Sequence, residues 1–309
     1  MVKKKKSFRW KNALPVYALM LPGILYFLIN NYLPMFGMII AFKKLNFRDG
    51  ILKSPWCGLD NFKFLFSQGN TALIMTRNTI LYNIVFIILG IIIPITVAIL
   101  LNEVQQKIAS RIYQTLILLP FLMSWVVVSY LAYAFLSGET GFINATILPF
   151  FGINQSISFY QQQKYWPFIL VFTNQWKSLG FGTVIYLASV IGISPEFYEA
   201  AQIDGASKWK QITNITLPCL KPTIITLTIL NIGRIFYSDF GLFYQVPKNS
   251  GMLYNVTQTI DTYVYNALMN QNNISMSAAA CVFQSIVGAA LVVISNQIIR
   301  KLSKENALF

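Results

Sequence analysis

The chain has 309 residues, of which 55% are hydrophobic and 11% are charged, and its formal net charge is +14. A water-soluble domain carries about a quarter charged residues, so this composition excludes an ordinary soluble globular protein. The charge-free stretches 12–42, 78–102 and 112–138 each exceed the roughly 20 apolar residues that cross a bilayer. The composition therefore predicts an integral membrane protein.

The positive charge lies mainly beside the apolar segments, which argues against a nucleic-acid partner. Basic residues at 3–6, 9 and 11 precede the first apolar segment, and others at 300, 301 and 304 follow the last. Nucleic-acid-binding proteins gather basic residues on a folded polar surface. Basic residues that flank spans instead indicate the cytoplasmic side, with anionic lipid as the nearby counter-charge. The first apolar segment is too long for a signal peptide, so we expect an uncleaved first span.

Six spans are predicted, which makes the fold an all-α polytopic membrane protein. In chain order they are 14–42, 78–101, 114–136, 166–193, 220–243 and 277–299. Three prolines in the first span predict a kink or tilt. We expect one domain: a basic tail at 1–13, the six-helix domain at 14–299 and a second tail at 300–309.

Six spans place both termini on one membrane side. The tails and the loops 102–113 and 194–221 together hold more Lys and Arg than the opposite loops, which predicts that this side is cytoplasmic. The basic loop 43–77 departs from that pattern. We expect it to contain a short interfacial helix near 59–66 on the outer surface, and the polar stretch 270–277 to be a loop.

Several chemistries are excluded by residue type. The chain has no histidine, which removes His-based acid–base catalysis, Ser-His-Asp triads and His-ligated metal sites. Cys57, Cys219 and Cys281 are scattered and lack metal-ligand spacing. No GxxxxGK[ST] phosphate-binding loop is present, so any ATP hydrolysis must come from another polypeptide.

Between the fourth and fifth predicted spans, the residues 194–218 favour two short helices. Ser194 is a suitable N-cap, and Pro195 suits the first helical turn. Gly205 is a natural C-terminal stop. Ser207 can cap a second helix, which we expect to end before Pro218. The segment is therefore expected to form a compact knob, and Phe197, Ala200 and Ala201 would give it a small apolar face for a partner's groove.

The same segment resembles the EAA signature of ABC importer permeases. The signature is Glu-Ala-Ala, three residues, Gly, nine residues and then Ile-x-Leu-Pro, and its elements here are Glu199, Ala200, Ala201, Gly205 and 215–218. The spacing is complete, and the resemblance implies the type I importer permease (MetI-like) fold. The segments 58–62, 77–79, 186–188, 261–265 and 295–296 resemble the carbohydrate-uptake branch labelled LplB-type.

This resemblance implies a transport subunit with no catalytic site, metal or cofactor of its own. In that family the EAA loop docks in a cleft of a cytoplasmic ATPase, and the ATP and Mg are bound by that partner. The expected partners are two ATPase subunits, a second and non-identical EAA-type permease, and an extracytoplasmic sugar-binding protein in a bacterial cytoplasmic membrane. Glu199 would contact the ATPase, Ala200 and Ala201 would allow a close fit, Asp204 would stabilise the knob and Gly205 would supply its turn.

Aromatic and amide side chains in the spans are candidates for an oligosaccharide path, because sugar C–H faces stack on rings. The candidates are Tyr130, Tyr133, Trp176, Tyr186, Asn231 and Tyr237, with Tyr263 and Tyr265 near the outer mouth. The alternative for each aromatic is membrane-interface packing. Charged residues inside spans face a bundle interior or a water-filled cavity. Lys177, Arg234 and Asp239 could therefore pair with a sister subunit, line the path or lie at the outer interface.

Three other functions stay open. A membrane-embedded sugar-processing enzyme would need clustered acids or a metal site, and the acidic residues cluster only at 196–204. An ABC permease for a non-carbohydrate solute would keep the knob but not the segment 58–62. A regulatory membrane protein would need no ATPase partner. Co-purification with an ATPase and a second permease separates these alternatives.

Overall fold

A computed structural model of the chain describes all residues except 1–9, 64–70, 105, 154, 271 and 303–309. The described residues are helical and contain no strand, apart from an isolated bridge between Lys43 and Trp56. The all-α prediction is confirmed. The α-helices are α1 (Trp10–Phe27), α2 (Leu33–Met35), α3 (Gly50–Lys53), α5 (Thr71–Asn102), α6 (Lys107–Leu122), α7 (Trp125–Leu136), α8 (Leu148–Phe150), α9 (Trp166–Ile191), α10 (Pro195–Ile203), α11 (Lys208–Gln211), α12 (Leu217–Ile232), α13 (Tyr254–Thr257), α14 (Ile260–Met269) and α15 (Ile274–Leu302).

Four helices in the described residues are long and apolar enough to cross a membrane: Tyr17–Phe42, Thr71–Asn102, Lys208–Ile232 and Ile274–Gln297. Two bent pairs pass the same test together. They are Lys107–Leu122 with Trp125–Leu136, bent by 96°, and Gln163–Ile191 with Pro195–Ile203, bent by 66°. The described residues therefore hold up to six crossings, as the sequence predicts.

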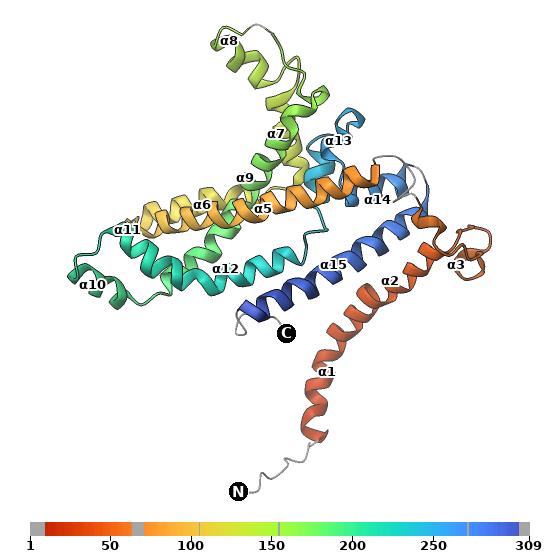
Figure 1. The fold of residues 1–309 in the computed structure, drawn as a ribbon, viewed down its shortest axis with the longest axis horizontal. Coiled ribbons are helices and arrows are strands. Elements are labelled where there is room, and N and C mark those ends of the chain that lie inside the picture. Colours follow the sequence, from red (N-terminus) through yellow and green to blue (C-terminus); the bar gives the residue numbers. More distant parts are fainter. Residues whose placement is uncertain (1–9, 64–70, 105, 154, 271, 303–309) are drawn as a thin grey trace.

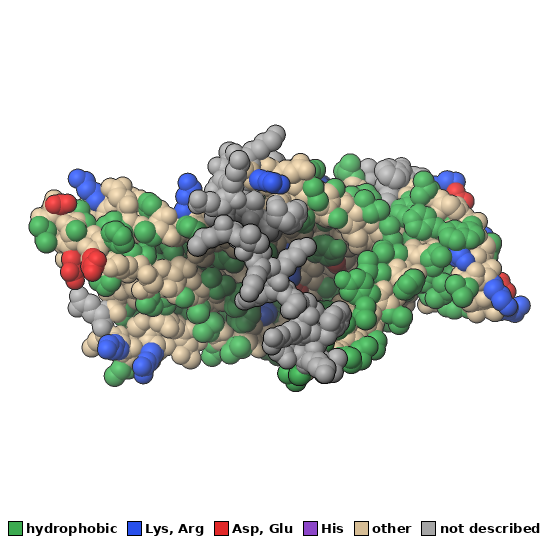
Figure 2. Space-filling view, turned by 90° about the horizontal axis from the view of Figure 1, so that it is seen from below, with side chains coloured by type: hydrophobic (Ala, Val, Ile, Leu, Met, Phe, Trp, Pro, Cys, Tyr) green, Lys and Arg blue, Asp and Glu red, His purple; other side chains and the backbone are tan. Residues whose placement is uncertain are grey.

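Several long helices run roughly along one axis, and others cross them. In Figure 1, α5, α6 and α12 extend along the molecule, α9 and α15 run obliquely to them, and α7 and α8 project away; α10 and α11 lie at one end, and α14 lies toward the other. Helix α9 packs against both α5 and α6, and α15 packs against α14. Acidic side chains stand at the two ends, while hydrophobic and uncharged atoms dominate the length between them (Figure 2). This distribution suits a belt of lipid around the middle.

Small residues on α9 allow its close packing. A Cβ atom on Gly180 would lie 2.3 Å from the backbone oxygen of Ile117 in α6, so only glycine fits there. Two residues further on, a Cβ on Gly182 would lie 3.1 Å from the ring of Pro94 in α5. Backbones that approach this closely gain dispersion and packing energy, which drives helix association in lipid where the hydrophobic effect does not.

The first span stands apart from the bundle. It comprises α1, the π-helical η1 (Leu28–Tyr32), α2 and the 3₁₀-helical η2 (Phe36–Phe42), and only 6% of its most apolar window is buried. Its η2 end packs on α15, whereas α1 diverges from the other helices (Figure 1). The predicted irregularity is present, since the helix type changes on both sides of Pro34.

The third span is not the single helix that was predicted for 114–136. Helix α6 ends two residues after Pro120, and α7 starts at a new cap, because the Ser124 side chain accepts a hydrogen bond from the Val127 backbone N–H at 3.3 Å. Proline cannot donate the helical hydrogen bond, and a serine N-cap stabilises a fresh start. The apolar run thus changes direction between Leu122 and Trp125.

The fifth span lies further toward the N-terminus than the predicted 220–243. It begins at Lys208, passes through α11, η7 (Ile212–Thr216) and α12, and ends at Ile232. The prediction that the second knob helix ends before Pro218 was therefore wrong, because the helix continues through that residue. Pro218 occupies the first turn of α12, where its missing N–H is tolerated, and the π-helical η7 absorbs the change.

Other predicted boundaries also shift. In the 59–66 region the structure has only the 3₁₀ turn η3 (Asp60–Phe62), and 64–66 lie outside the described residues. The second span begins at Thr71 rather than 78, and α15 begins at Ile274, within the stretch predicted as a loop. Helix α14 was not predicted, because its ten residues are too few for a span; its Thr259–Thr262 capping box fixes its start.

Candidate functional site

The knob, residues 194–218, owes its shape to local backbone chemistry. Gly205 has φ +72°, its N–H donates to the Gln202 carbonyl at 3.0 Å, and the Ala206 N–H donates to the Ala201 carbonyl at 2.8 Å. These two bonds form a Schellman motif, which ends α10 at a left-handed glycine as predicted. Ser207 caps α11 by accepting from the Lys210 N–H at 3.4 Å, which is also as predicted. Ser194 occupies the N-cap position of α10, but its side chain makes no cap bond, so that part of the prediction was wrong.

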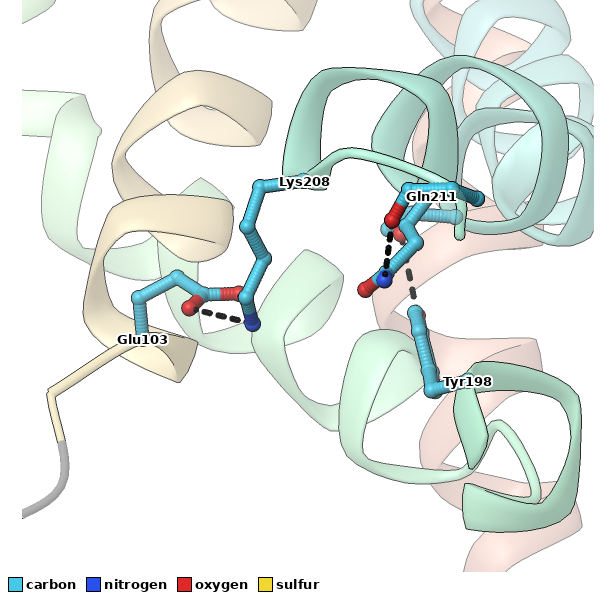
Figure 3. A network of polar contacts seen from close by, with 6 residues as sticks. Glu103, Tyr198, Lys208 and Gln211 are labelled. Atoms are coloured by element: carbon cyan, nitrogen blue, oxygen red, sulfur yellow. Dashed lines mark hydrogen bonds and ion pairs between the residues drawn. The ribbon is translucent and has the colours of Figure 1, made fainter. Parts of the chain in front are cut away.

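Three side-chain contacts hold the knob in place: two lie within it, and one joins it to the end of α5 (Figure 3). The Tyr198 and Thr216 hydroxyls lie 2.9 Å apart and join α10 to the end of η7, directly before α12. The buried Gln211 amide donates to the Ala206 carbonyl at 3.1 Å. The Lys208 ammonium lies 2.9 Å from the Glu103 carboxylate, which follows α5. The knob is therefore positioned relative to both α5 and the 208–232 helix.

Three large apolar side chains of the knob are exposed. Phe197 is 59% exposed, Ile203 is 87% exposed and Trp209 is 73% exposed. Exposed large apolar side chains on a loop held in a fixed conformation are typical of a protein-binding surface.

The EAA residues lie on this same knob. Glu199 and Ala200 are exposed on α10, and Ala201 is half-buried. Asp204 is also exposed, and in the described residues its side chain forms no hydrogen bond or ion pair that would stabilise the knob.

A second candidate site is a cavity of about 490 Å³ between α5, α9 and α12. Its polar lining consists of Asn83, Asn174, Ser178, Tyr186, Asn231, Arg234, Tyr237, Ser238 and Asp239. Three of the predicted path residues, Tyr186, Asn231 and Tyr237, therefore meet at one cavity. The end of the 208–232 helix and the residues directly after it form one wall of this cavity.

Short turns after Ile232 align side chains on the cavity wall. The Arg234 N–H donates to the Asn231 carbonyl at 3.0 Å, and the Tyr237 N–H donates to the Arg234 carbonyl at 2.8 Å. Side chains three residues apart in such turns project in the same direction. The Asn83 amide on α5 donates to the Ile235 and Tyr237 carbonyls, at 3.0 Å each, and holds these turns in place.

The charged residues of the predicted spans do not pair with one another. The Asp239 carboxylate accepts from the Trp125 indole N–H at 2.8 Å and from the Gly241 N–H at 2.9 Å. The Lys177 ammonium donates to the Phe121 carbonyl at 2.9 Å and lies 5.1 Å from the centroid of the Trp125 ring. Both contacts fix the break between α6 and α7. The ion pairs among the described residues are Lys63–Asp60 and Lys208–Glu103, so Arg234 has no ionic partner there.

The remaining predicted path residues lie elsewhere. Trp176 lines a different, apolar cavity of about 650 Å³ between α7 and α9. The Lys248 ammonium lies 3.5 Å from the Tyr133 ring centroid and 5.5 Å from that of Tyr130. Beside Tyr133, burial raises the pKa of the Tyr160 phenol. These contacts place the Tyr130 and Tyr133 rings against a lysine rather than at the polar cavity.

Tyr263 and Tyr265 lie on α14 and do not line the polar cavity. Tyr263 is buried in an apolar core with residues of α5 and α15. The Tyr265 ring packs against Phe240 at 4.7 Å and Tyr244 at 4.9 Å between centroids.

The sequence-based prediction missed Ser238 in the turns after Ile232 and the helical residues Asn83, Asn174 and Ser178, which complete the polar wall. The last three are uncharged polar residues inside otherwise apolar helices, and this feature could have found them, since lipid-facing positions disfavour such groups. Among the described residues, no group of three or more Cys, Asp or Glu side chains is placed to hold a metal ion.

Comparison with known proteins is informative over most of the chain. Residues 87–304 match the family model described as the binding-protein-dependent transport system inner membrane component. The polygalacturonan/rhamnogalacturonan transport system permease protein YteP of Bacillus subtilis is 36% identical, over 94% of this chain and 89% of that protein. Protein LplB of the same organism is 36% identical, over 97% of this chain and 94% of that protein.

A solved structure agrees with the fold. It is the crystal structure of a bacterial alginate ABC transporter in complex with alginate pentasaccharide-bound periplasmic protein. One of its chains superposes with a TM-score of 0.85 at 33% identity and covers 95% of this chain and 96% of its own length. The similarity therefore extends over the knob, the cavity and the bundle together.

Proposed function

This chain belongs to the family of binding-protein-dependent transport system inner membrane components, and on that basis we propose that it imports an oligosaccharide. It is a permease, a transport subunit embedded in the membrane, and not an enzyme. The solute would be delivered by an extracytoplasmic binding protein, and a separate ATPase would supply the energy. Relatives named for polysaccharide transport, and a polar cavity with amide, hydroxyl and phenol groups, support a sugar as the solute.

One observation carries the coupling mechanism: a single helix joins the knob to the cavity. Its 25 residues from Lys208 to Ile232 span about 37 Å at the rise of an α-helix. Asn231 lines the cavity at one end, and the Tyr198–Thr216 contact braces α10 near the other. A movement imposed on the knob would therefore displace the cavity wall, because a helix moves as a rigid rod along its axis.

The ATPase would grip the exposed surface of the knob. Glu199 would make a polar contact, Ala200 and Ala201 would allow close approach, and Gly205 would hold the turn. Two ATPase subunits would carry the ATP and Mg, and this chain would carry neither. The knob end of the molecule, and both termini, would then face the cytoplasm of a bacterial cell.

A second, non-identical permease would complete the pathway. The first span supports this, since only 6% of its most apolar window is buried within this chain. The cavity wall formed by Asn231, Arg234 and Tyr237 would face the corresponding wall of the second permease, and the solute would pass between them.

The coupling proposal is tested with Ala201→Arg in the complete importer in proteoliposomes. The bulky cation would prevent docking, so oligosaccharide uptake and co-purification of the ATPase should both be lost while the chain stays in the membrane. Gln106→Arg, which puts the same charge on the exposed neighbouring loop, is the matched control and should transport normally. Normal uptake by Ala201→Arg would refute the docking role.

A further inference from the structure

Arg234 is a cation in the turns that directly follow the fifth span, and no ion pair in the described chain neutralises it. It lines the polar cavity, and its side chain makes no hydrogen bond or ion pair with any described residue. An unpaired charge that lines a cavity between apolar helices is costly unless it faces water or a partner of opposite charge. The Arg234 side chain is therefore expected to face water or a negatively charged group.

The acidic residues near the cavity are already engaged. Asp239 accepts from the Trp125 indole and from two backbone N–H groups at the start of η8 (Gly241–Gln245). Asp261 accepts from the Ser238 backbone N–H and hydroxyl, at 2.7 Å each, and from the Gln284 amide at 3.2 Å. Asp239 lines the same cavity as Arg234, but these donors hold both carboxylates, and neither forms an ion pair with Arg234 in the described chain.

The neighbours of Arg234 on the same wall are suited to sugar recognition. Asn231 and Tyr237 stand three residues to either side, aligned by the two successive turns that bond their backbones. Neither side chain is hydrogen-bonded to another described residue. An amide can exchange hydrogen bonds with sugar hydroxyls, and a phenol ring offers a stacking face. The wall thus presents an amide, a guanidinium and an aromatic ring in sequence.

We propose that Arg234 binds a carboxylate group of the transported solute, which makes the solute an acidic, uronate-containing oligosaccharide. This inference rests on the proposed import function and names its substrate class. The planar guanidinium matches a carboxylate through two parallel charge-assisted hydrogen bonds, whereas the hydroxyls of a neutral sugar accept hydrogen bonds without compensating the charge. Asn231 and Tyr237 hold the adjoining hydroxyls and ring face. Lys177 takes no part, because its ammonium is bound at the α6–α7 break.

The test is an internal competition in proteoliposomes that hold the complete importer. The probe is a mixture of oligogalacturonides of one length with graded methyl esterification, supplied with the importer's own binding protein. Mass spectrometry of the imported pool gives the ratio of free-acid to esterified members. The same binding protein serves every variant, so a change in that ratio between wild type and variant reports on the permease alone.

Wild type should import the free-acid members, and Arg234→Gln should reduce their share relative to the fully esterified members by about tenfold or more, as expected for a lost charge-assisted contact. Arg234→Lys keeps the positive charge but lacks the planar pair of guanidinium N–H donors. Its share of free-acid members should lie between those of wild type and Arg234→Gln. A variant that imports all members less, in unchanged proportion, would show a structural role or a pairing with the second permease, and would overturn the inference.

Failure of the inference is distinguishable from failure of the proposed function. Wild-type importer that accepts neutral oligosaccharides and rejects every free-acid member overturns the carboxylate inference alone. Wild-type importer that accepts neither kind, with intact subunits and active ATPase, overturns the proposed function and the inference with it. Gel filtration of the purified complex confirms that Arg234→Gln and Arg234→Lys assemble like wild type before import is compared.

Discussion

Gly205→Ala isolates the backbone requirement of the knob from any packing effect. Gly205 has φ +72°, and a Cβ placed there would meet nothing within 4 Å, so the added methyl causes no clash. The cost is then the left-handed conformation itself, about 1–2 kcal/mol for a residue with a Cβ. With no compensating contact, the ratio of molecules with an intact Schellman turn to molecules with a disrupted turn should fall by about five- to thirtyfold.

The assay is ATP-driven oligosaccharide uptake, measured beside ATPase activity, in proteoliposomes with equal amounts of each variant. Gly205→Ala should lose uptake in proportion to the disrupted turn, and Gly205→Asn should retain more, since asparagine tolerates this region. Gly152→Ala is the matched control: it has φ +75° and equally open surroundings, but it follows α8, far along the chain from the knob. If Gly205→Ala transported like Gly152→Ala, or if asparagine were worse than alanine, the link between turn geometry and coupling would be refuted.

Two further predictions concern packing and surface charge. Gly180→Ala should destabilise the α6–α9 contact by about 1–3 kcal/mol, because its Cβ would overlap the Ile117 backbone, and thermal inactivation of the detergent-purified complex should show this. Gly90→Ala, which meets nothing within 4 Å, should leave that inactivation temperature unchanged. Lys208→Ala should cost under about 1 kcal/mol and leave uptake close to wild type, because its ion pair with Glu103 is exposed; a large loss of uptake would show that the pair does more than hold the knob.

Local chemistry was read correctly from the sequence where a few adjacent residues decide it. Gly205 ends α10 and Ser207 caps α11, as the residue types predict. Of the predicted apolar face, Phe197 and Ala200 are exposed and Ala201 is half-buried. Helix α9 also begins and ends close to its predicted limits, since Pro167 favours its first turn and Gly192 follows its last residue. In each case the interactions lie within one or two helical turns.

Span boundaries were harder to predict, because apolar composition marks a helix without fixing its direction or its ends. The bend at Ser124 follows from a cap bond inside a run that looks continuous in hydrophobicity. The fifth span begins at Lys208, among polar residues that an apolar window leaves out, and it ends at Ile232, where the apolar composition still continues.

What the sequence by itself determined is the class of the protein: a helical membrane chain with a structured knob of EAA spacing, because bilayer thickness and turn chemistry act on short segments. What only the tertiary structure decided is which polar side chains share a cavity. Asn83 reaches the backbone at Tyr237, 154 positions away, whereas Trp176 on the same helix as Asn174 lines another cavity. Helices that are apolar on every side carry little information about which face meets which neighbour, so that choice depends on glycine contacts and interhelical hydrogen bonds formed only on packing.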